Sequence, residues 1–338
     1  MPSASFSISQ AQKPALSESR ACGQVSRMQA RHTLRIATRG SKLSLAQTQL
    51  VADLLRDRWP RLTLSIVTVE TLGDRHRDVP LASFRGPDGI FTRGIEAEVL
   101  AGQADVALHS LKDVPTTSRD ELVLAAFPPR GDPRDALVSP ESGGFDDLPS
   151  GARIGTSSPR RAAQILALRS DLQVAEIRGN VDSRLRKVRS GEVDAIVLAA
   201  AGLERLGLRD AISEYLPTER FTPAVGQGAL VAQCRADDQT TIHLLMAIDD
   251  GPTRAEVTAE RAFLQAIGGG CRVPVAANAR VVGERLDLRA FIAAADGRTV
   301  LTANAGGATE RAAEIGRELG AKLLTDARAS SIVELGRV

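Results

Sequence analysis

Two periodicities of hydrophobic and polar residues alternate along the chain and predict its first elements. Short apolar or β-rich runs at 34–38, 62–69 and 104–109 are typical of strands in a sheet. Apolar residues recur at helical spacing over 41–58 and 91–101. The order of these segments predicts a β-α-β-α-β unit.

The same order of elements recurs after residue 150. The segment Arg153-Ile154-Gly155-Thr156 resembles Arg35-Ile36-Ala37-Thr38, which opens the first unit. A helix is predicted over 159–169, a strand over 172–177, a helix over 181–189 and a strand over 194–198. We therefore expect an α/β protein with two doubly wound lobes around a cleft, joined near the Pro- and Gly-containing segment 128–133.

The rest of the chain predicts a return to the first lobe and then a further domain. Segment 222–228 is interpreted as a second crossing, after which 229–234 is expected as a strand of the first lobe. From residue 251 the pattern changes to a helix over 254–267, strands over 273–282, 285–293 and 299–305, and a helix over 309–324. The expected domains are a first lobe of 33–130 and 229–248, a second lobe of 134–222, and a small C-terminal α+β domain of 251–338.

Residues 1–32 differ in composition from the rest of the chain. They are rich in Ser, Ala and Gln, and Glu18 is their only acid. They contain no apolar segment of the kind that a secretory signal needs. Two interpretations remain: an organelle transit peptide, or a disordered extension with Met28 as the true start. We favour the second, and with it a cytoplasmic protein; a transit peptide would place the protein in a plastid or another organelle.

Composition excludes several classes of function. The 338 residues are 43% hydrophobic and 3% aromatic with a net charge of +2, so nucleic-acid binding is not expected. The longest apolar stretch, near 195–203, is about half of the ~20 residues that a membrane-spanning helix requires.

Three cysteines without a Cys-x-x-Cys pair indicate a reducing compartment and no structural metal site. Of the 43 basic residues only five are Lys, so the cations are mostly bidentate Arg.

Residues that suit an anionic ligand occur at matching positions in both lobes. In the second lobe Ser157 or Ser158 can cap a helix whose first turn carries Arg160 and Arg161. Cations oppose the helix dipole there unless an anion compensates them. We therefore expect these arginines to bind ligand carboxylates rather than to stabilise the fold, so that removing them leaves thermal stability unchanged or slightly raised. The turn at 38–42 repeats the arrangement in the first lobe.

The segment His109-Ser-Leu-Lys-Asp-Val-Pro115 ends the third strand of the first lobe and places Lys112 beside Asp113. Neighbouring opposite charges are commonly a surface pair of little energetic value. At a cleft edge rich in arginines, a lone carboxylate is instead a candidate catalytic group. His109 alone is more typical of a strand-end histidine whose hydrogen bonds are satisfied within the fold than of a catalytic base.

Cys271 follows three glycines, Gly268-Gly269-Gly270, and precedes Arg272. A lone cysteine is often a small buried apolar residue, and the glycines could simply form a turn. The same glycines have no side chains, so they would also leave space for a bulky group to bind at the sulfur. The other motifs of the chain favour this second interpretation.

Taken together, six motifs in order from about Leu34 to the C-terminus closely resemble the porphobilinogen deaminase (hydroxymethylbilane synthase) family. They are Arg39 with Ser41, His109–Pro115, Gly155–Arg161, Arg178-Gly179-Asn180, Pro223–Gly228 and Gly269–Pro274. The resemblance implies two lobes like those of periplasmic binding proteins, and an enzyme that joins four porphobilinogens head to tail with release of ammonia. The linear hydroxymethylbilane is then released by hydrolysis. It also implies a small-molecule substrate, and we expect a monomer.

The resemblance further implies residue roles. The cysteine matching Cys271 holds a dipyrromethane cofactor by a thioether, and the aspartate matching Asp113 handles pyrrole protons and stabilises cationic intermediates. The residues implied for the cofactor, besides Cys271, are Lys112, Ser157, Arg160, Arg161 and Arg184. Those implied for the substrate are Arg39, Ser41, Arg178 and Arg205. Each pyrrole brings two carboxylates, so many bidentate donors are the expected chemistry.

The chain departs from the family in one loop. Where the family commonly has Gly-Gly-Lys-Gly-Leu-Phe, this chain has Gly86-Pro-Asp-Gly-Ile-Phe91. The loop 73–89 is a candidate lid, and the substrate contact of the missing lysine is in doubt. Two other functions share part of the pattern: an anion-binding module, which needs neither Lys112-Asp113 nor the Cys271 loop, and a Cys-dependent acyl transferase, which would need a His to activate Cys271.

Overall fold

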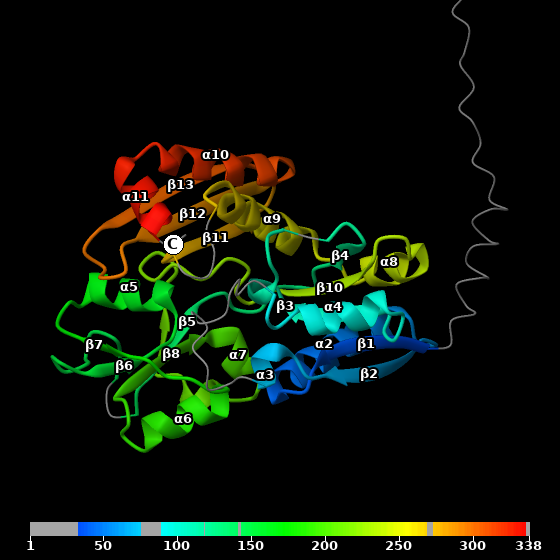
Figure 1. Ribbon diagram of the computed structural model, residues 1–338, viewed down its shortest axis with the longest axis horizontal. Coiled ribbons are helices and arrows are strands. Elements are labelled where there is room, and N and C mark those ends of the chain that lie inside the picture. Colours follow the sequence, from blue (N-terminus) through cyan, green and yellow to red (C-terminus); the bar gives the residue numbers. More distant parts are fainter. Residues whose placement is uncertain (1–32, 76–88, 118, 141–142, 269–272, 336–338) are drawn as a thin grey trace, which may run out of the picture.

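The computed structural model describes residues 33–75, 89–117, 119–140, 143–268 and 273–335. Two lobes lie side by side, and a C-terminal domain lies above the second lobe and next to the first in the view of Figure 1. The expected N-terminal extension, 1–32, and most of the candidate lid, 76–88, fall outside the described residues. Cys271 falls outside them as well.

The first lobe contains a five-stranded sheet in the order β2-β1-β3-β10-β4. Its strands are β1 (Thr33–Arg39), β2 (Thr63–Val69), β3 (Val106–Ser110), β4 (Leu122–Ala126) and β10 (Leu230–Arg235). Its helices are α2 (Lys42–Arg58), α3 (Leu72–Arg75), α4 (Arg93–Leu100) and α8 (Gln239–Met246), and the 3₁₀ turn η2 (Leu111–Asp113) follows β3. β10 runs antiparallel to β3 with Val231 opposite His109, so the predicted return of 229–234 to this lobe is confirmed.

The second lobe repeats the plan with the order β7-β6-β8-β5-β9. Its strands are β5 (Asp135–Val138), β6 (Arg153–Gly155), β7 (Gln173–Ala175), β8 (Ala195–Ala199) and β9 (Glu214–Leu216). Its helices are α5 (Pro159–Leu168), α6 (Val181–Arg189) and α7 (Ala200–Arg205), with the 3₁₀ turn η3 (Arg209–Ala211). In both sheets a strand from outside the β-α-β-α-β unit pairs antiparallel with the third strand of that unit. β10 pairs with β3 in the first lobe, and β5 pairs with β8 in the second.

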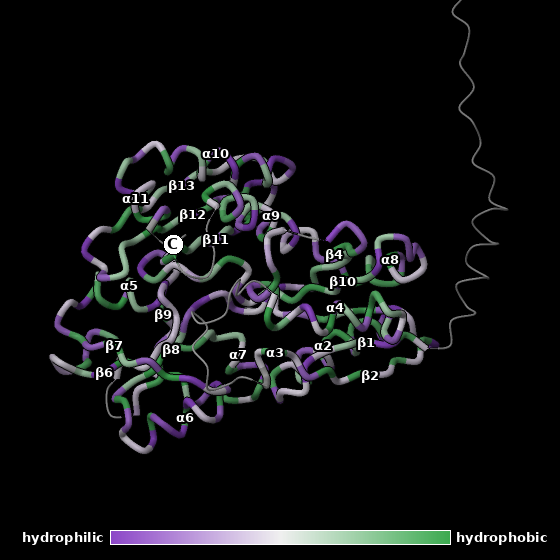
Figure 2. The backbone as a smooth tube through the Cα atoms, in the orientation of Figure 1, coloured by the Kyte–Doolittle hydropathy of each residue, from purple (hydrophilic) through white to green (hydrophobic). Residues whose placement is uncertain are grey.

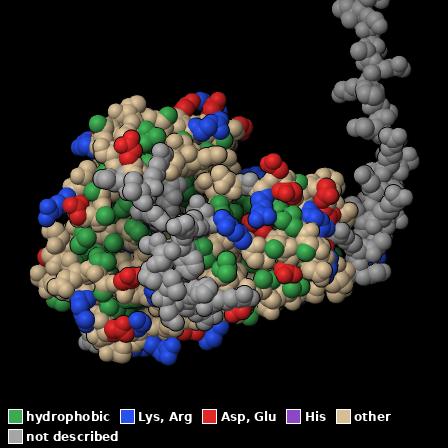
Figure 3. Space-filling model, viewed as in Figure 1, with side chains coloured by type: hydrophobic (Ala, Val, Ile, Leu, Met, Phe, Trp, Pro, Cys, Tyr) green, Lys and Arg blue, Asp and Glu red, His purple; other side chains and the backbone are tan. Residues whose placement is uncertain are grey.

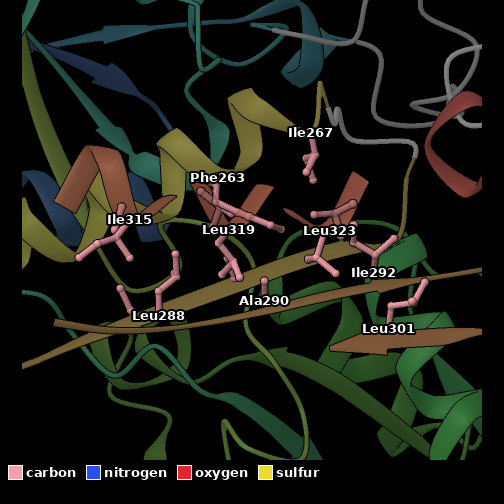
Figure 4. Close-up of a cluster of buried hydrophobic side chains, with 14 of the residues drawn as sticks. Phe263, Ile267, Leu288, Ala290, Ile292, Leu301, Ile315, Leu319 and Leu323 are labelled. Atoms are coloured by element: carbon pink, nitrogen blue, oxygen red, sulfur yellow. The ribbon is translucent and has the colours of Figure 1, made fainter. Parts of the chain in front are cut away.

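The C-terminal domain packs helices on one face of an antiparallel sheet. The strands are β11 (Val275–Val282), β12 (Arg285–Ala293) and β13 (Val300–Ala308), in the order β11-β12-β13. The helices are α9 (Gly251–Ala266), α10 (Ala312–Leu324) and α11 (Ala327–Leu335), with the 3₁₀ turn η4 (Thr309–Arg311) before α10. Figure 4 shows side chains of α9 and α10, such as Phe263 and Leu319, meeting Leu288 and Ile292 of β12.

Hydrophobic burial accounts for the elements that the sequence pattern predicts. Strand β1 and helix α2 share one hydrophobic cluster. It contains Leu34 and Ile36 of β1 and Val51 and Leu55 of α2, all fully buried. Figure 2 shows hydrophobic colour concentrated along interior strands and helix faces. The α/β class with two lobes and a small C-terminal domain is therefore confirmed. The pattern did not predict α3, β4, β5, β9, α7, α8 or α11.

One buried carboxylate joins all three parts of the molecule. Glu260 of α9 is fully buried and accepts hydrogen bonds from Arg130 Nη1 at 2.8 Å and Nη2 at 3.1 Å. Arg130 lies in the first crossing between the lobes. Glu260 also accepts the backbone N–H of Gly226, in the second crossing, at 2.7 Å, and that of Ala279, in β11, at 2.7 Å. Both crossings are thus fixed to the C-terminal domain.

We expect Glu260→Ala to destabilise the folded protein strongly. It leaves the buried charge of Arg130 without its main partner, and breaking such a pair costs about 3–5 kcal/mol. Urea unfolding followed by circular dichroism measures the loss. Glu314→Ala, which removes an exposed partner of Arg311, is the matched control and is expected to cause no measurable change. Equal stability of both variants would contradict the role assigned to Glu260.

Candidate active site

A cleft of about 520 Å³ lies between the two lobes, and its lining is strongly cationic. Two carboxylates, Asp113 and Asp182, line it within the part of the chain that the structure describes. By contrast, acidic and basic side chains are interspersed on the outer face drawn in Figure 3. The seven cations of the lining are Arg39, Lys42, Lys112, Arg161, Arg178, Arg184 and Arg205.

Three helices begin at this cleft, as the sequence predicts for two of them. Ser41, Ser158 and Asn180 cap α2, α5 and α6, and each side chain accepts a backbone N–H three residues on, at 3.1, 3.4 and 2.9 Å. Ser158 rather than Ser157 is the cap of α5, which leaves the Ser157 hydroxyl lining the cleft. The uncapped N–H groups of a first turn favour anions, so this edge suits carboxylate ligands.

Arg160 and Arg161 have a protein partner that the sequence analysis did not identify. Both guanidinium groups bind Asp135 of β5 at 2.7 Å, and all three side chains are buried. Burial alone would raise the pKa of Asp135, but the charges of Arg160 and Arg161 lower it. Gln227 Nε2 also donates to Asp135, at 3.1 Å. The carboxylate therefore stays ionised and fixes both arginines.

This geometry corrects the expectation that the two arginines do not stabilise the fold. Arg160 also donates to the carbonyl oxygen of Thr222, and it is absent from the described lining of the cleft. Arg161 does line the cleft, while its Nη1 donates to Val197 O at 2.9 Å. The compensating anion of the first turn is thus Asp135, and of the two arginines Arg161 alone lines the cleft as described.

Lys112 and Asp113 both line the cleft at the end of β3, on η2. The surrounding protein desolvates the Lys112 ammonium and Arg161 repels it, which lowers its pKa to about 8 although the side chain reaches the water of the cleft. Among the described residues Asp113 forms neither an ion pair nor a side-chain hydrogen bond, with Lys112 or with any other group. The carboxylate is therefore available to a ligand, as predicted for a catalytic group.

Arg261 of α9 holds the loop that follows Asp113. Its Nη1 donates to Val114 O at 3.0 Å and its Nη2 to Pro115 O at 2.6 Å, and burial lowers its pKa to about 10. The C-terminal domain thereby positions the candidate catalytic loop of the first lobe. The sequence analysis missed this residue, because an arginine within an amphipathic helix gives no signal of a contact nearly 150 residues away.

Other lining residues support the cations of the first lobe. The Arg39 guanidinium lies over the Phe91 ring at 4.4 Å from its centroid, a cation–π contact. A Cβ on Gly73 would come within 2.1 Å of that ring, so a larger residue there would require the Phe91 ring to move. Gln47 of α2 donates to Ser110 at 3.0 Å, directly before η2. None of these supporting contacts was predicted.

The second lobe contributes Arg178, Arg184 and Arg205. Arg184 Nε donates to Gly179 O at 2.9 Å, and burial with the nearby charges of Arg161 and Arg178 lowers its pKa to about 10. Arg205 Nη2 donates to Gly228 O at 2.6 Å, which ties α7 to the second crossing. All three predicted arginines therefore reach the cleft together with Arg39, Ser41 and Lys112.

His109 is a structural residue of β3. It is buried, its Nε2 pairs with Gln233 Oε1 at 3.2 Å, and burial lowers its pKa to about 4. The expectation of a satisfied strand-end histidine is confirmed. Within the described residues no group of His, Cys, Asp and Glu could hold a metal ion, and no helix is long and apolar enough to cross a membrane.

Comparison with known proteins identifies relatives over most of the chain. A family model described as porphobilinogen deaminase, dipyromethane cofactor binding domain, matches residues 34–243, and one described as porphobilinogen deaminase, C-terminal domain, matches 254–325. A porphobilinogen deaminase of Roseiflexus sp. (strain RS-1) is 50% identical over 280 residues, covering 83% of this chain and 92% of that protein. One of Syntrophus aciditrophicus (strain SB) is 44% identical over 291 residues, covering 86% and 95%.

We expect Arg160→Met to lower stability by about 3 kcal/mol, because the buried carboxylate of Asp135 and the carbonyl oxygen of Thr222 lose the charged hydrogen-bond donors of Arg160. Denaturant unfolding measures the change. Arg209→Met, which removes an exposed partner of Glu204 in the same lobe, is the control and should leave the midpoint unaltered. If the unfolding midpoint of Arg160→Met were unchanged or raised, Arg160 would not stabilise the fold, as first expected from the sequence.

Proposed function

The chain belongs to the porphobilinogen deaminase family, and we propose that the cleft between its lobes is where it carries out the family's reaction. That reaction is hydroxymethylbilane synthesis, a transferase activity of tetrapyrrole biosynthesis. Four porphobilinogens are joined head to tail with loss of ammonia, and the linear product is released by hydrolysis. From the few cysteines we further infer a reducing compartment such as the cytoplasm. From the family resemblance we infer a monomer.

The donor set of the cleft fits a dipyrromethane cofactor. When bound, this group supplies the pyrrole position to which the first substrate is joined. Lys112, Ser157, Arg161 and Arg184 line the cleft and offer cationic or hydroxyl donors to its carboxylates. Arg160 supports Arg161 through Asp135 instead of lining the cleft. Cys271 is the proposed attachment point, on the strength of its sequence motif.

Substrate carboxylates have their own set of donors. Arg39 and Ser41 come from the first lobe, and Arg178 and Arg205 from the second, so a substrate between the lobes can contact both. Arginine binds carboxylates through two parallel hydrogen bonds, which fixes orientation as well as affinity. These residues orient the substrate ring for attack and hold its charge away from the apolar cores.

Asp113 is the proposed catalytic group. Departure of ammonia leaves positive charge on the substrate's pyrrole ring, and a fixed carboxylate stabilises that charge in a site otherwise lined by cations. The same carboxylate can accept the proton that is lost when aromaticity is restored. The observation that carries this assignment is that Asp113, alone of the two lining carboxylates, has no ion-pair partner among the described residues.

Intact-mass spectrometry tests the covalent cofactor. The purified protein should exceed its sequence mass by two linked pyrrole units, on a peptide that contains Cys271, and Cys271→Ser should lose both this mass and turnover. Cys234→Ser is the matched control, because burial raises the pKa of the Cys234 thiol to about 12 and keeps it unreactive. An adduct on Cys234, or none at all, would refute the assignment.

We expect Asp113→Asn to fold, to carry the cofactor and to bind porphobilinogen, yet to turn over more slowly by on the order of 10² or more. The amide keeps the shape and removes the charge. Asp113→Glu should retain more activity, since charge survives while geometry shifts. Single-turnover kinetics on the cofactor-loaded variants give the measurement. A rate for Asp113→Asn near that of the unmodified enzyme would make the residue structural.

A further inference from the structure

An ion pair joins the two lobes across the mouth of the cleft. Lys42, the first residue of α2 in the first lobe, places its Nζ 2.8 Å from Oδ2 of Asp182, in the first turn of α6 in the second lobe. Both residues line the cleft. Asp182 is therefore the second of the two lining carboxylates, and its charge is matched by a cation of the opposite lobe.

A close approach of two helices accompanies this ion pair. α2 of the first lobe is a neighbour of α7 in the second, and a Cβ added at Gly202 of α7 would lie 3.7 Å from the Leu43 side chain. Leu43 follows Lys42 in the chain, so the first turn of α2 reaches α6 through charge and lies beside α7. The lobes thus meet at the cleft mouth as well as at the two crossings.

The contact is suited to open and close. The side chains of Lys42 and Asp182 are 78% and 39% exposed, so water replaces their interaction at little cost. Lys42 also stands at the N-terminus of α2, where the helix dipole disfavours a cation. A buried pair such as Arg130 with Glu260 would instead hold the lobes together, because breaking it is strongly destabilising.

The size of the cleft requires such an opening. About 520 Å³ lies in the range of pockets for one drug-sized ligand, ~300–1,000 Å³. The proposed function joins four substrates, and the lengthening product must separate the lobes to remain between them. Resting on that function, we propose that Lys42 and Asp182, where α2 also approaches α7, form a clasp that is closed in the early additions and opens as the product lengthens.

Two neutralising variants test the clasp, because they change the charge of the cleft in opposite directions. Lys42→Gln removes a cation and Asp182→Asn removes an anion, but each breaks the same ion pair. Cofactor-loaded enzyme is mixed with saturating porphobilinogen at low ionic strength, quenched, and resolved by intact mass into forms with zero to three added units. Because the broken ion pair no longer opposes opening, both variants should raise the fraction of forms with two and three added units by about two- to fivefold, the range for an exposed ion pair.

Three controls accompany these variants. The exchanged pair Lys42→Asp with Asp182→Lys should restore the original distribution, and salt near 1 M should abolish the difference between variants and unmodified enzyme. Lys187→Gln breaks an exposed ion pair with Glu192 inside the second lobe and should change nothing. Opposite shifts for the two variants would show that they act on substrate charge, and unchanged distributions would also overturn the clasp.

A zero-length carbodiimide cross-link reports the contact directly. In the resting enzyme it should join Lys42 to Asp182 as an amide, detected in the linked peptides, and its yield should fall in the forms with two and three added units. A constant yield, or no link at rest, would refute the clasp. If the unmodified enzyme acquires no added units at all, the proposed function fails instead, and the resting link still reports whether the lobes meet.

Discussion

The arrangement of the molecule depends on a carboxylate that is wholly removed from water. Glu260 accepts hydrogen bonds from both crossings between the lobes and from β11, so three parts of the chain share one buried anion. Burial raises the pKa of Glu260, and the charge of Arg130 opposes that shift. The cost of burying the pair is offset only if every donor stays in place, which makes this junction intolerant of displacement. The lobes can therefore move only beyond it, on the side of the cleft mouth.

A second buried carboxylate determines which cations face the ligand. Asp135 neutralises part of the charge of Arg160 and Arg161 below the floor of the cleft, and Gln227 links it to the second crossing. Without this anion, two adjacent guanidinium groups in the first turn of α5 would repel each other and the helix dipole. The cleft can thus present Arg161 to an anion in the same place whether or not a ligand is bound. Preorganisation of this kind reduces the reorganisation that binding requires.

Local pattern was sufficient to predict much of the fold. The predicted bounds of α6 and β12 agree with the structure, because their apolar periodicity is uninterrupted and Asn180 caps α6 by a recognisable motif. β5 is only four residues long and gave no periodicity to detect. Nothing local therefore marked Asp135, which lies 25 residues from Arg160 in sequence and 2.7 Å from it in space.

The candidate site was predictable for a different reason. Lys112, Asp113 and the arginines of the cleft follow strand ends, and in open α/β sheets the carboxyl ends of strands meet at the ligand site. Their supporting contacts come from other parts of the fold, such as Arg261 from α9 and Phe91 over Arg39, and depend on tertiary packing. Long-range pairing of single residues leaves no periodic trace in one sequence, so these partners could not be found.

The charge of the cleft also bears on why the reaction ends. Each added pyrrole brings two carboxylates, whereas seven cations of the described residues line the cleft, and Lys42 is engaged with Asp182. The early product is attracted by the cationic lining, but later carboxylates find fewer donors and repel those already bound. Carboxylates held without donors in a desolvated cleft are costly, so water becomes the better environment as length increases. Growth therefore weakens retention through electrostatics as well as through space, and both effects act at the mouth, where the two lobes are held by an exposed ion pair.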